Sequence, residues 1–512
     1  MTRSDWKIIV LVAVLLTLSF PPFPLGFLAP IALAVLLNYI LHLPVNRGFA
    51  IGYWSAVLWG FLTLYWIANN TLPGMLLTVF IGALHYGLVW WLVRRVHEYF
   101  PRLALWIFPV VWVAAEFFRQ FTDLRFNWLN LAYTQTYYLP YIQLAEITGY
   151  LGVSFLLAVL GVLLYCIVRF PHRRFGSVGV MLALIILPSL YGWWRIQALE
   201  ATKIARVKVA VVQPNVDPYQ KWEPAFQEQA FAILDSLTLQ AVGDSPRVVI
   251  WPETATPFFL RNEPRYLKRI HQIVDSFEIC LLTGTPDYQY HTEAREYHTY
   301  NAAFFFRPHF EPFQFYYKMA LVPAAESMPF KQIFPFLRKI NVGGGDFFPG
   351  REFKVFRCAA SNETNNSYTH PSGKVRLSVA ICYESVFPQI VRGFVQNGAN
   401  ILAVITNDGW FGTTSGPYQH QQYAVFRAIE HRISVARSAN TGISVFIAPT
   451  GKIIGRLPLN SQGVLSGWLP IREQPTLYTR WGDWLGWLAV IISILVLTPA
   501  HFLKQKWGKA HP

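Results

Sequence analysis

Three short segments of this 512-residue chain carry a carboxylate, an amine and a thiol in positions that suit covalent catalysis. Glu253 follows the apolar run 248–251, and Cys382 follows the apolar run 377–381, with Lys318 between them in the chain. A thiol needs a base to become a nucleophilic thiolate, and a tetrahedral oxyanion needs a positive charge or N–H donors. Glu253, Lys318 and Cys382 supply these three functions, with Cys382 as the nucleophile.

Each of these residues also has an ordinary structural interpretation. A cysteine after an apolar strand is usually a core residue, Glu253 could cap a following helix, and Lys318 could be a surface cation. Glu384, close to Cys382, could pair with any basic neighbour. The combination favours chemistry, because ligand sites in α/β sheets lie beyond the strand ends, where Glu253 and Cys382 are expected to meet.

The other cysteines carry no metal-site or redox pattern. The chain has 4 cysteines, none in a CxxC pair, and no Cys/His cluster has the spacing of a zinc site. Cys166 lies in an apolar run and Cys280 in a strand-like run, so both are predicted to be core thiols. No disulfide framework is expected, and the chemistry requires no metal or cofactor.

The strands that must position the three residues belong to a long segment, 201–478, that is polar enough to be soluble. Many of its strand-like runs are continuous and β-branched, which is typical of strands buried on both faces. A helix is expected over 418–432. The expected strands are 207–212, 248–251, 279–283, 302–306, 377–381, 401–406 and 444–448. Alternation of strands and helices predicts one α/β domain.

The flanking parts of the chain have the composition of a membrane protein. Hydrophobic residues make up 53% of the chain and charged residues 14%, whereas a typical soluble domain has about 25% charged residues. An apolar run of about 20 residues can cross a bilayer. We expect a bundle of seven spans in 1–200 and an eighth span with a cytoplasmic tail in 479–512. The spans cover 6–20, 25–42, 49–68, 73–93, 102–118, 150–168, 177–194 and 481–502.

Loop charges predict the orientation of these spans, because cytoplasmic loops are rich in Lys and Arg. With the N-terminus in the cytoplasm, the outer loops near 20–25 and 69–73 hold neither residue, and the outer loop 119–149 holds two arginines. The cytoplasmic segments hold Arg3, Lys7, Arg47, Arg94, Arg95, Arg102, Arg169, Arg173, Arg174, Lys504, Lys506 and Lys509. The domain 201–478 is therefore placed outside the cytoplasm. The net charge of +15 is attributed to these loops and to anionic lipid, not to nucleic acid.

The segments around Glu253, Lys318 and Cys382 resemble the nitrilase, or carbon–nitrogen hydrolase, superfamily, which uses a Glu-Lys-Cys triad in an αββα sandwich. With spans before and after the domain, the whole chain resembles the apolipoprotein N-acyltransferase family, which completes bacterial lipoprotein maturation. Further matching segments are 221–222, 406–412, 416–420 and 437–442. One departure is Ala324-Ala325, where the family usually has Phe-Gly. We expect it to alter loop packing near Lys318 and to leave the chemistry unchanged.

The resemblance implies a two-step reaction at the bacterial inner membrane, with the α/β domain on the periplasmic side. Glu253 would be the general base, Lys318 the oxyanion stabiliser and Cys382 the nucleophile. Cys382 would take a fatty acyl chain from a phospholipid, with phosphatidylethanolamine as the expected donor, and hold it as a thioester. The α-amine of the diacylglyceryl-modified N-terminal cysteine of an apolipoprotein would then accept the chain.

The resemblance also implies supporting residues. Glu326 and Glu384 would be acids that support the lysine and the cysteine. Tyr383 would contribute its backbone N–H to the oxyanion hole. Trp222 and Trp410 would lie near the substrate opening, although tryptophan also favours lipid interfaces without any role in binding. The stretch 318–348, rich in Phe and Pro, is predicted to form part of a mobile lid over an acyl-binding groove.

Three other functions remain open at this point. A membrane-anchored amidase or nitrilase-like hydrolase would use the same triad and pass the acyl group to water, but a mere anchor needs one span and not eight. A related transferase could acylate another amine, such as that of a glycolipid. A transporter or receptor with a folded ectodomain usually has ionisable residues within its spans, but the predicted spans hold few, of which His85 and Glu116 are the clearest.

Overall fold

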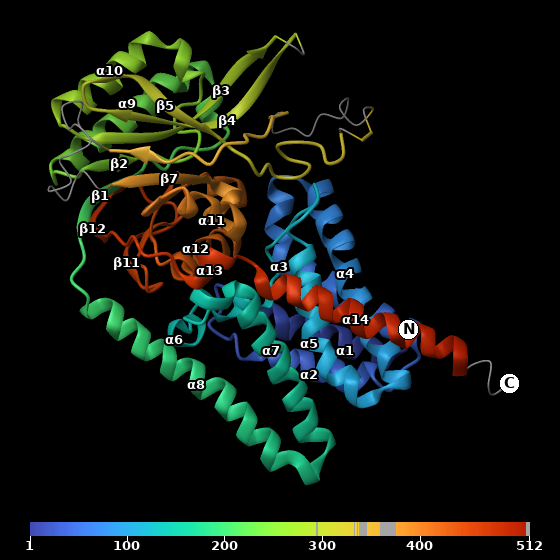
Figure 1. Ribbon diagram of the computed structural model, residues 1–512. Coiled ribbons are helices and arrows are strands. Elements are labelled where there is room, and N and C mark those ends of the chain that lie inside the picture. The colour runs from blue at the N-terminus through green and yellow to red at the C-terminus, as the bar shows by residue number, and fades with distance from the viewer. Residues whose placement is uncertain (293–294, 332, 335, 337–345, 359–374, 508–512) are drawn as a thin grey trace. The chain divides into compact units, whose positions relative to one another are not determined.

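The computed structural model describes residues 1–292, 295–331, 333–334, 336, 346–358 and 375–507 (Figure 1). Contacts within the chain divide it into two compact units. The first consists of Met1–Ala68, Leu72–Gln197 and Trp481–Pro512, and the second of Asn69–Thr71 and Ala198–Arg480. Each unit is described by itself below.

The first unit is built from apolar helices. They are α1 (Arg3–Ser19), α2 (Leu28–Ile40), α3 (Val45–Leu64), α4 (Leu72–Tyr99), α5 (Pro101–Phe118), α6 (Leu139–Ile142), α7 (Ala145–Arg169), α8 (Arg174–Ala201) and α14 (Trp484–Trp507). Of the described helices, 5 are long and apolar enough to cross a membrane, namely α4, α5, α7, α3 with the turn after it, and α8 with the turn before it. Membrane-spanning helices are thus confirmed. Helices also lie at the remaining predicted spans, but the number eight stays a prediction.

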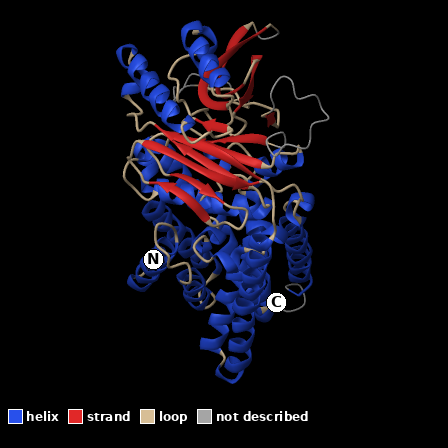
Figure 2. Cartoon of the chain, turned by 90° about the vertical axis from the view of Figure 1, so that its left-hand side faces the viewer, coloured by secondary structure: helices blue, strands red, loops and turns tan. Residues whose placement is uncertain are grey.

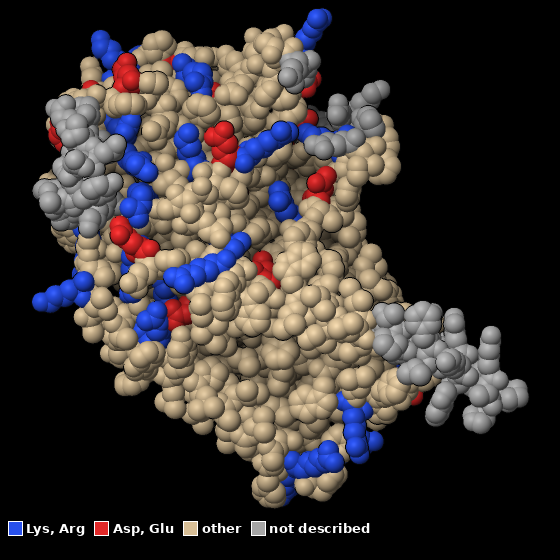
Figure 3. All heavy atoms as spheres, in the orientation of Figure 1, with Lys and Arg blue, Asp and Glu red and all other residues tan. Residues whose placement is uncertain are grey.

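Charged side chains are sparse on the helical surface that Figure 3 displays. Basic side chains gather there at the turn between α7 and α8, and this turn contains Arg169, Arg173 and Arg174. Inside the unit, Glu116 of α5 is fully buried. It accepts hydrogen bonds from the Trp112 indole N–H at 3.0 Å and from the Leu131 backbone N–H at 2.8 Å. Such contacts suit a structural carboxyl group that joins a helix to a neighbouring loop.

The second unit contains every strand of the described chain (Figure 2). One six-stranded sheet has the order β12-β1-β2-β3-β4-β5, and the other has the order β11-β10-β9-β8-β7-β6. The first sheet consists of β1 (Arg206–Gln213), β2 (Val248–Ile250), β3 (Cys280–His291), β4 (Glu296–Arg307), β5 (Phe310–Tyr317) and β12 (Gly463–Pro470). The second consists of β6 (Phe356–Arg357), β7 (Arg376–Ile381), β8 (Ile401–Thr406), β9 (Ser434–Ala439), β10 (Ser444–Ile447) and β11 (Ile453–Leu457).

Parallel strands lie at the centre of each sheet, and all of them except β9 come from the predicted apolar runs; β9 is fully buried but contains two serines and an arginine and was not predicted. Strands β1, β2 and β3 pair in parallel, as do β7, β8 and β9. All seven predicted strands exist, and β8 has the predicted bounds. Two were predicted too short: the run 279–283 belongs to the 12-residue β3 and 302–306 to the 12-residue β4. Their polar ends form a hairpin, which the apolar pattern alone does not reveal.

Helices cover the sheets, as the alternating pattern predicts. On the first sheet, α9 (Pro224–Val242) and α10 (Pro264–Ser276) share one apolar core with β2 and β3. Near the second lie α11 (Pro388–Gln396), α12 (Gly416–His431) and α13 (Leu477–Trp481). The predicted helix 418–432 corresponds to α12.

Polar contacts join the two sheets at their centre. The Ser438 hydroxyl of β9 donates to the Val212 carbonyl of β1 at 3.0 Å, and the Ser444 hydroxyl of β10 donates to Gln213 at 2.6 Å. The α/β fold of this unit is therefore confirmed.

One prediction about the cysteines was wrong. Cys280, expected to be a core thiol, forms a disulfide with Cys358 across 78 residues of sequence. Cys280 begins β3 of the first sheet, and Cys358 follows β6 of the second, so the bond links the two sheets. Both residues are buried. Only the tertiary pairing of distant strands brings the two thiols together, and no local spacing motif reports it.

Candidate active site

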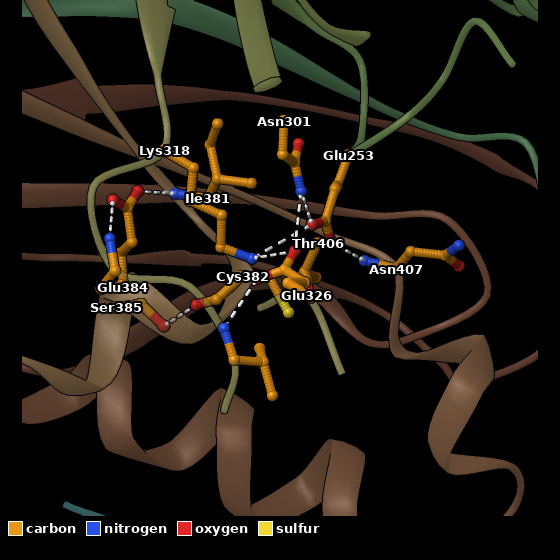
Figure 4. A network of polar contacts seen from close by, with 12 residues as sticks. Glu253, Asn301, Lys318, Glu326, Ile381, Cys382, Glu384, Ser385, Thr406 and Asn407 are labelled. Atoms are coloured by element: carbon orange, nitrogen blue, oxygen red, sulfur yellow. Dashed lines mark hydrogen bonds and ion pairs between the residues drawn. The ribbon is translucent and has the colours of Figure 1, made fainter. Parts of the chain in front are cut away.

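Three strand ends deliver the predicted catalytic residues to one place (Figure 4). Glu253 follows β2, and Lys318 directly follows β5, both in the first sheet. Cys382 directly follows β7 in the second sheet. The structure therefore brings Glu253, Lys318 and Cys382 together from both sheets.

Lys318 lies at the centre of this group. Its side chain is 1% exposed, and its Nζ atom lies 2.8 Å from Glu326 Oε1 and 3.6 Å from Glu253 Oε1. Burial alone would lower the pKa of Lys318, but the negative charges of Glu326 and Glu253 raise this pKa above its ordinary value. Lys318 is therefore a fixed cation at neutral pH, as an oxyanion stabiliser has to be.

Asn301 of β4 is a site residue that the sequence analysis missed. Its side-chain amide donates to Glu253 Oε1 at 2.8 Å and to Glu326 Oε1 at 3.1 Å. The other oxygen of Glu253 accepts the Asn407 backbone N–H at 3.0 Å. Both oxygens of Glu253 are thus held in place. The available signal was a polar residue within a buried strand, which is weak because many such residues serve only structure.

Left-handed backbone occurs at Cys382 and close to Glu253 and Glu326. Cys382 has φ +51°, Thr254 next to Glu253 has φ +49°, and Ala324 near Glu326 has φ +58°. Residues other than glycine rarely adopt this left-handed conformation, which costs about 1–3 kcal/mol and clusters at functional sites. Ala324 occupies part of the predicted departure from the family pattern, so the loop near Lys318 keeps a tight turn there.

Burial and the negative charge of Glu253 raise the pKa of the Cys382 thiol, and the charge of Lys318 lowers it in part. Cys382 is therefore a neutral thiol at neutral pH before substrate binds. If Cys382 is the nucleophile, another group has to accept its proton during the reaction. Glu253 is the candidate, because its charge has the largest effect of any nearby charge on the pKa of Cys382.

Glu384 is fully buried and joins two of the strand ends. Its Oε2 atom accepts the Ile381 N–H at 2.8 Å (Figure 4). Its Oε1 atom accepts the Met319 N–H at 2.6 Å and the Tyr316 hydroxyl at 2.7 Å. Glu384 thus connects the residue before Cys382 to the residue after Lys318. Burial raises the pKa of Glu384.

The remaining predicted residues lie around this centre. Tyr383 is buried, and its ring packs edge-on against Phe387. The Trp222 side chain is 43% exposed, and Trp410 packs edge-on against Tyr219 at 5.0 Å. Neither tryptophan has a described contact with the triad, so their place near a substrate opening stays a prediction.

Lys221 is a second buried cation near Glu253 that the sequence analysis did not select for chemistry. Its Nζ atom donates to the Thr254 carbonyl at 2.9 Å, next to Glu253. Burial lowers the pKa of Lys221 to about 8, although the charge of Glu253 opposes this shift. Its neighbour Trp222 was the more conspicuous residue in the sequence, which is why Lys221 was overlooked.

The predicted lid is described in part. Its first residues are fixed to the site, because the Val322 N–H donates to Glu326 Oε2 at 2.8 Å. Phe348, at its end, stacks on the His298 ring with 3.5 Å between ring centroids. Residues 337–345, which include the Gly343-Gly344-Gly345 run, lie outside the described residues, and the lid stays a prediction.

Two family models match the chain. The model for carbon–nitrogen hydrolases matches residues 208–472, and the model for the N-terminal domain of apolipoprotein N-acyltransferases matches residues 12–163. Solved structures are more distant. A nitrilase-superfamily protein of Saccharomyces cerevisiae aligns with a TM-score of 0.39 and 17% identity over 53% of this chain and 93% of its own. An amidase of Nesterenkonia aligns with a TM-score of 0.37 and 19% identity over 52% and 92% of the two chains.

Curated relatives match almost the full length. The apolipoprotein N-acyltransferase of Geobacter metallireducens is 36% identical over 96% of this chain and 95% of its own. That of Chlorobaculum tepidum is 34% identical over 96% of both chains. These relatives cover almost the whole chain, and both family models match it, with apolar helices ahead of the carbon–nitrogen hydrolase unit. The chain therefore belongs to the apolipoprotein N-acyltransferase family of membrane enzymes.

Proposed function

We propose that this enzyme transfers a fatty acyl chain from a phospholipid, with phosphatidylethanolamine as donor, to the α-amine of diacylglyceryl-modified apolipoproteins. The observation that carries this proposal is the position of Lys318, buried between Glu253 and Glu326 and coupled electrostatically to Cys382. A base, a fixed cation and a thiol are the groups that a thioester-forming acyl transfer needs.

In the first half-reaction, Glu253 accepts the proton of Cys382 while the sulfur attacks the ester carbonyl of the phospholipid. Lys318 and the Tyr383 N–H stabilise the oxyanion. The bond between the carbonyl carbon and the glycerol oxygen then breaks, and Glu253 protonates that oxygen. A lysophospholipid leaves, and the acyl chain remains as a thioester on Cys382. Glu326 and Asn301 hold Lys318 and Glu253 in register throughout.

In the second half-reaction, the α-amine of the apolipoprotein attacks the thioester. The carbon–sulfur bond breaks, and the proton lost by the nitrogen passes through Glu253 to the Cys382 sulfur, which restores the thiol. An amide forms without ATP, because a thioester is much more reactive toward an amine than an oxygen ester is. Water has to be kept from the thioester, and the burial of Lys318 and Glu253 is consistent with such exclusion.

The proposed location is the bacterial inner membrane, with the catalytic domain 201–478 an αββα sandwich on the periplasmic side and eight spans in 1–200 and 479–512. The Cys280–Cys358 disulfide supports this side of the membrane, because disulfides persist in oxidising compartments and are rare in the cytosol. The loop charges of the sequence support the same orientation.

The test is an assay with the detergent-solubilised full chain, phospholipid vesicles and a diacylated lipopeptide. The amide product should appear with the wild-type enzyme and be absent with Cys382→Ala. Free fatty acid without amide would instead identify a hydrolase. Amide formation by Cys382→Ala would rule out the nucleophile, and an acylated amine on a glycolipid alone would reassign the acceptor.

A further inference from the structure

A fully buried polar network lies behind Cys382 and has no part in the mechanism above. It consists of Asp408 and His420, which follow β8 and begin α12, and Arg437 of β9. One nitrogen of Arg437 lies 2.6 Å from Asp408 Oδ2 and 3.1 Å from His420 Nδ1. His420 Nδ1 also lies 3.0 Å from Asp408 Oδ1. Burying three such groups costs free energy. This cost suggests that the network has a task, and its contacts show which part of the chain it fixes.

The network ends on the backbone of the nucleophile. His420 Nε2 lies 3.1 Å from the carbonyl oxygen of Cys382, and the Ser385 hydroxyl donates to the same oxygen at 2.8 Å. His420 Nε2 also lies 3.0 Å from the Ser385 hydroxyl. Because a carbonyl oxygen can only accept hydrogen bonds, this contact assigns the ring proton of His420 to Nε2, which donates to Cys382, and leaves Nδ1 to accept from Arg437.

That carbonyl belongs to the peptide group that joins Cys382 to Tyr383. A peptide group is planar, with its C=O and N–H pointing in opposite directions. Donors that fix the carbonyl of Cys382 therefore also fix the direction of the Tyr383 N–H. Cys382 has φ +51°, a conformation that relaxes unless its surroundings hold it.

We propose that His420, held by Arg437, which Asp408 holds in turn, is a positioning residue that aims the Tyr383 N–H at the oxyanion. His420 touches no reacting atom and acts through the Cys382–Tyr383 peptide group. Ser385 is the second donor to that group. This inference rests on the proposed function, because an oxyanion hole is needed only if Cys382 attacks a carbonyl.

Two reactions of the same thiol separate this role from a general effect on folding. Acylation of Cys382 by phospholipid passes through an oxyanion, whereas alkylation by iodoacetamide does not. Cys166 is the other free cysteine of the chain, so a Cys166→Ser background makes both reactions report on Cys382. Losing one oxyanion donor lowers the rate about 10²–10³-fold. A donor that points in the wrong direction is expected to lower the rate at least about tenfold.

In His420→Leu, the rate constant of acylation should fall at least about tenfold with an unchanged KM for phospholipid and an unchanged alkylation rate. His420→Gln, whose amide can still donate to the Cys382 carbonyl, should recover most of the acylation rate. The matched control is His431→Leu, because His431 is also buried in α12 and contacts Thr479 instead. This control should acylate at the wild-type rate.

Ser385→Ala provides a second route if His420→Leu does not fold, and it should also lower acylation and spare alkylation. The inference is overturned if acylation by the folded variants matches the wild type, or if acylation and alkylation fall together. Failure of the wild-type enzyme to acylate Cys382 at all would instead refute the proposed function.

Discussion

At the scale of single residues, the site depends on one buried lysine shared between two carboxylates. Glu326 is closer to Lys318 than Glu253 is, at 2.8 Å compared with 3.6 Å. This asymmetry suits a division of work, in which Glu326 neutralises the cation and Glu253 remains available to accept a proton. The side-chain amide of Asn301 donates to both carboxylates, which fixes their positions relative to one another.

Replacing the cation should remove the oxyanion stabilisation. Lys318→Ala is expected to lower kcat for amide formation by roughly 10²–10³. The matched control is Lys452→Ala, since Lys452 belongs to the same unit and its side chain is 62% exposed. The control should keep wild-type turnover. A Lys318→Ala enzyme within a factor of two of the wild type would reduce Lys318 to a structural cation.

The pH dependence of thiol alkylation reports on Glu253. Its negative charge raises the pKa of Cys382, whereas Lys318 lowers it. Removing the negative charge in Glu253→Gln should therefore lower this pKa, so that the thiolate forms at lower pH. In the Cys166→Ser background, the alkylation profile of Glu253→Gln should shift toward lower pH while acylation by phospholipid is blocked. A shift in the opposite direction would mean that Glu253 does not act on the thiol.

Residue types predicted the candidate triad, because a thiol, a base and a cation after strand-like runs form a recognisable set. They did not reveal Asn301, His420 or Lys221. Lys221 and His420 lie in segments that resemble the family, 221–222 and 416–420, but the resemblance gave them no role. The contacts of all three residues depend on distances set by the sheets, which the local sequence does not report. Glu384 was recognised as a supporting acid, but its contacts with the Ile381 and Met319 N–H groups required the structure.

At the scale of elements, the ends of β5 and β7 are held together by a single carboxylate. Among the described residues, four donate hydrogen bonds to Glu384. They are Tyr316, Met319 and Ala320 at the end of β5 and Ile381 at the end of β7. The parallel strands β1, β2, β3, β7 and β8 were predictable because complete burial requires continuous apolar runs. The parallel strand β9 was missed, because its buried residues include two serines and an arginine. The hairpin of β3 and β4 and the strands at the sheet edges were missed because exposed residues interrupt their apolar pattern.

Weakening the hydrogen bonds of Glu384 should destabilise the second unit and lower the activity of the enzyme. In Glu384→Gln, an amide NH₂ replaces one acceptor oxygen and faces a backbone N–H. Leaving a buried donor unsatisfied costs about 1–3 kcal/mol, so the melting temperature of the solubilised enzyme should fall. Glu311→Gln is the control, because the Glu311 side chain is 79% exposed, and it should melt like the wild type. Equal melting temperatures of the two variants would contradict the role assigned to Glu384.

At the scale of the whole molecule, one chain combines apolar helices with an α/β unit, as the proposed transfer of an acyl chain from a lipid requires. Composition and loop charge predicted this division because the bilayer imposes a simple rule on apolar length. The disulfide between the sheets escaped prediction, since its two cysteines are 78 residues apart. Its presence nevertheless makes the side of the membrane testable.

The redox state of the cysteines in cells should report the location of the second unit. If this unit is extracytoplasmic, alkylation of the non-reduced protein should label two cysteines, Cys166 and Cys382, and prior reduction should raise the number to four. Cys358→Ser should lower the melting temperature, because a crosslink over this loop length stabilises by up to about 4 kcal/mol. Four reactive cysteines in freshly harvested cells would contradict the proposed side.

The central claim is that Cys382 carries the acyl chain. The most direct measurement is the intact mass of the purified full-length enzyme after incubation with phospholipid alone, followed by peptide mapping. We predict an added fatty-acyl mass located on Cys382, sensitive to hydroxylamine, absent from Cys382→Ala and lost when a diacylated lipopeptide is added. An enzyme that forms the amide product but never carries an acyl group on Cys382 would contradict the account.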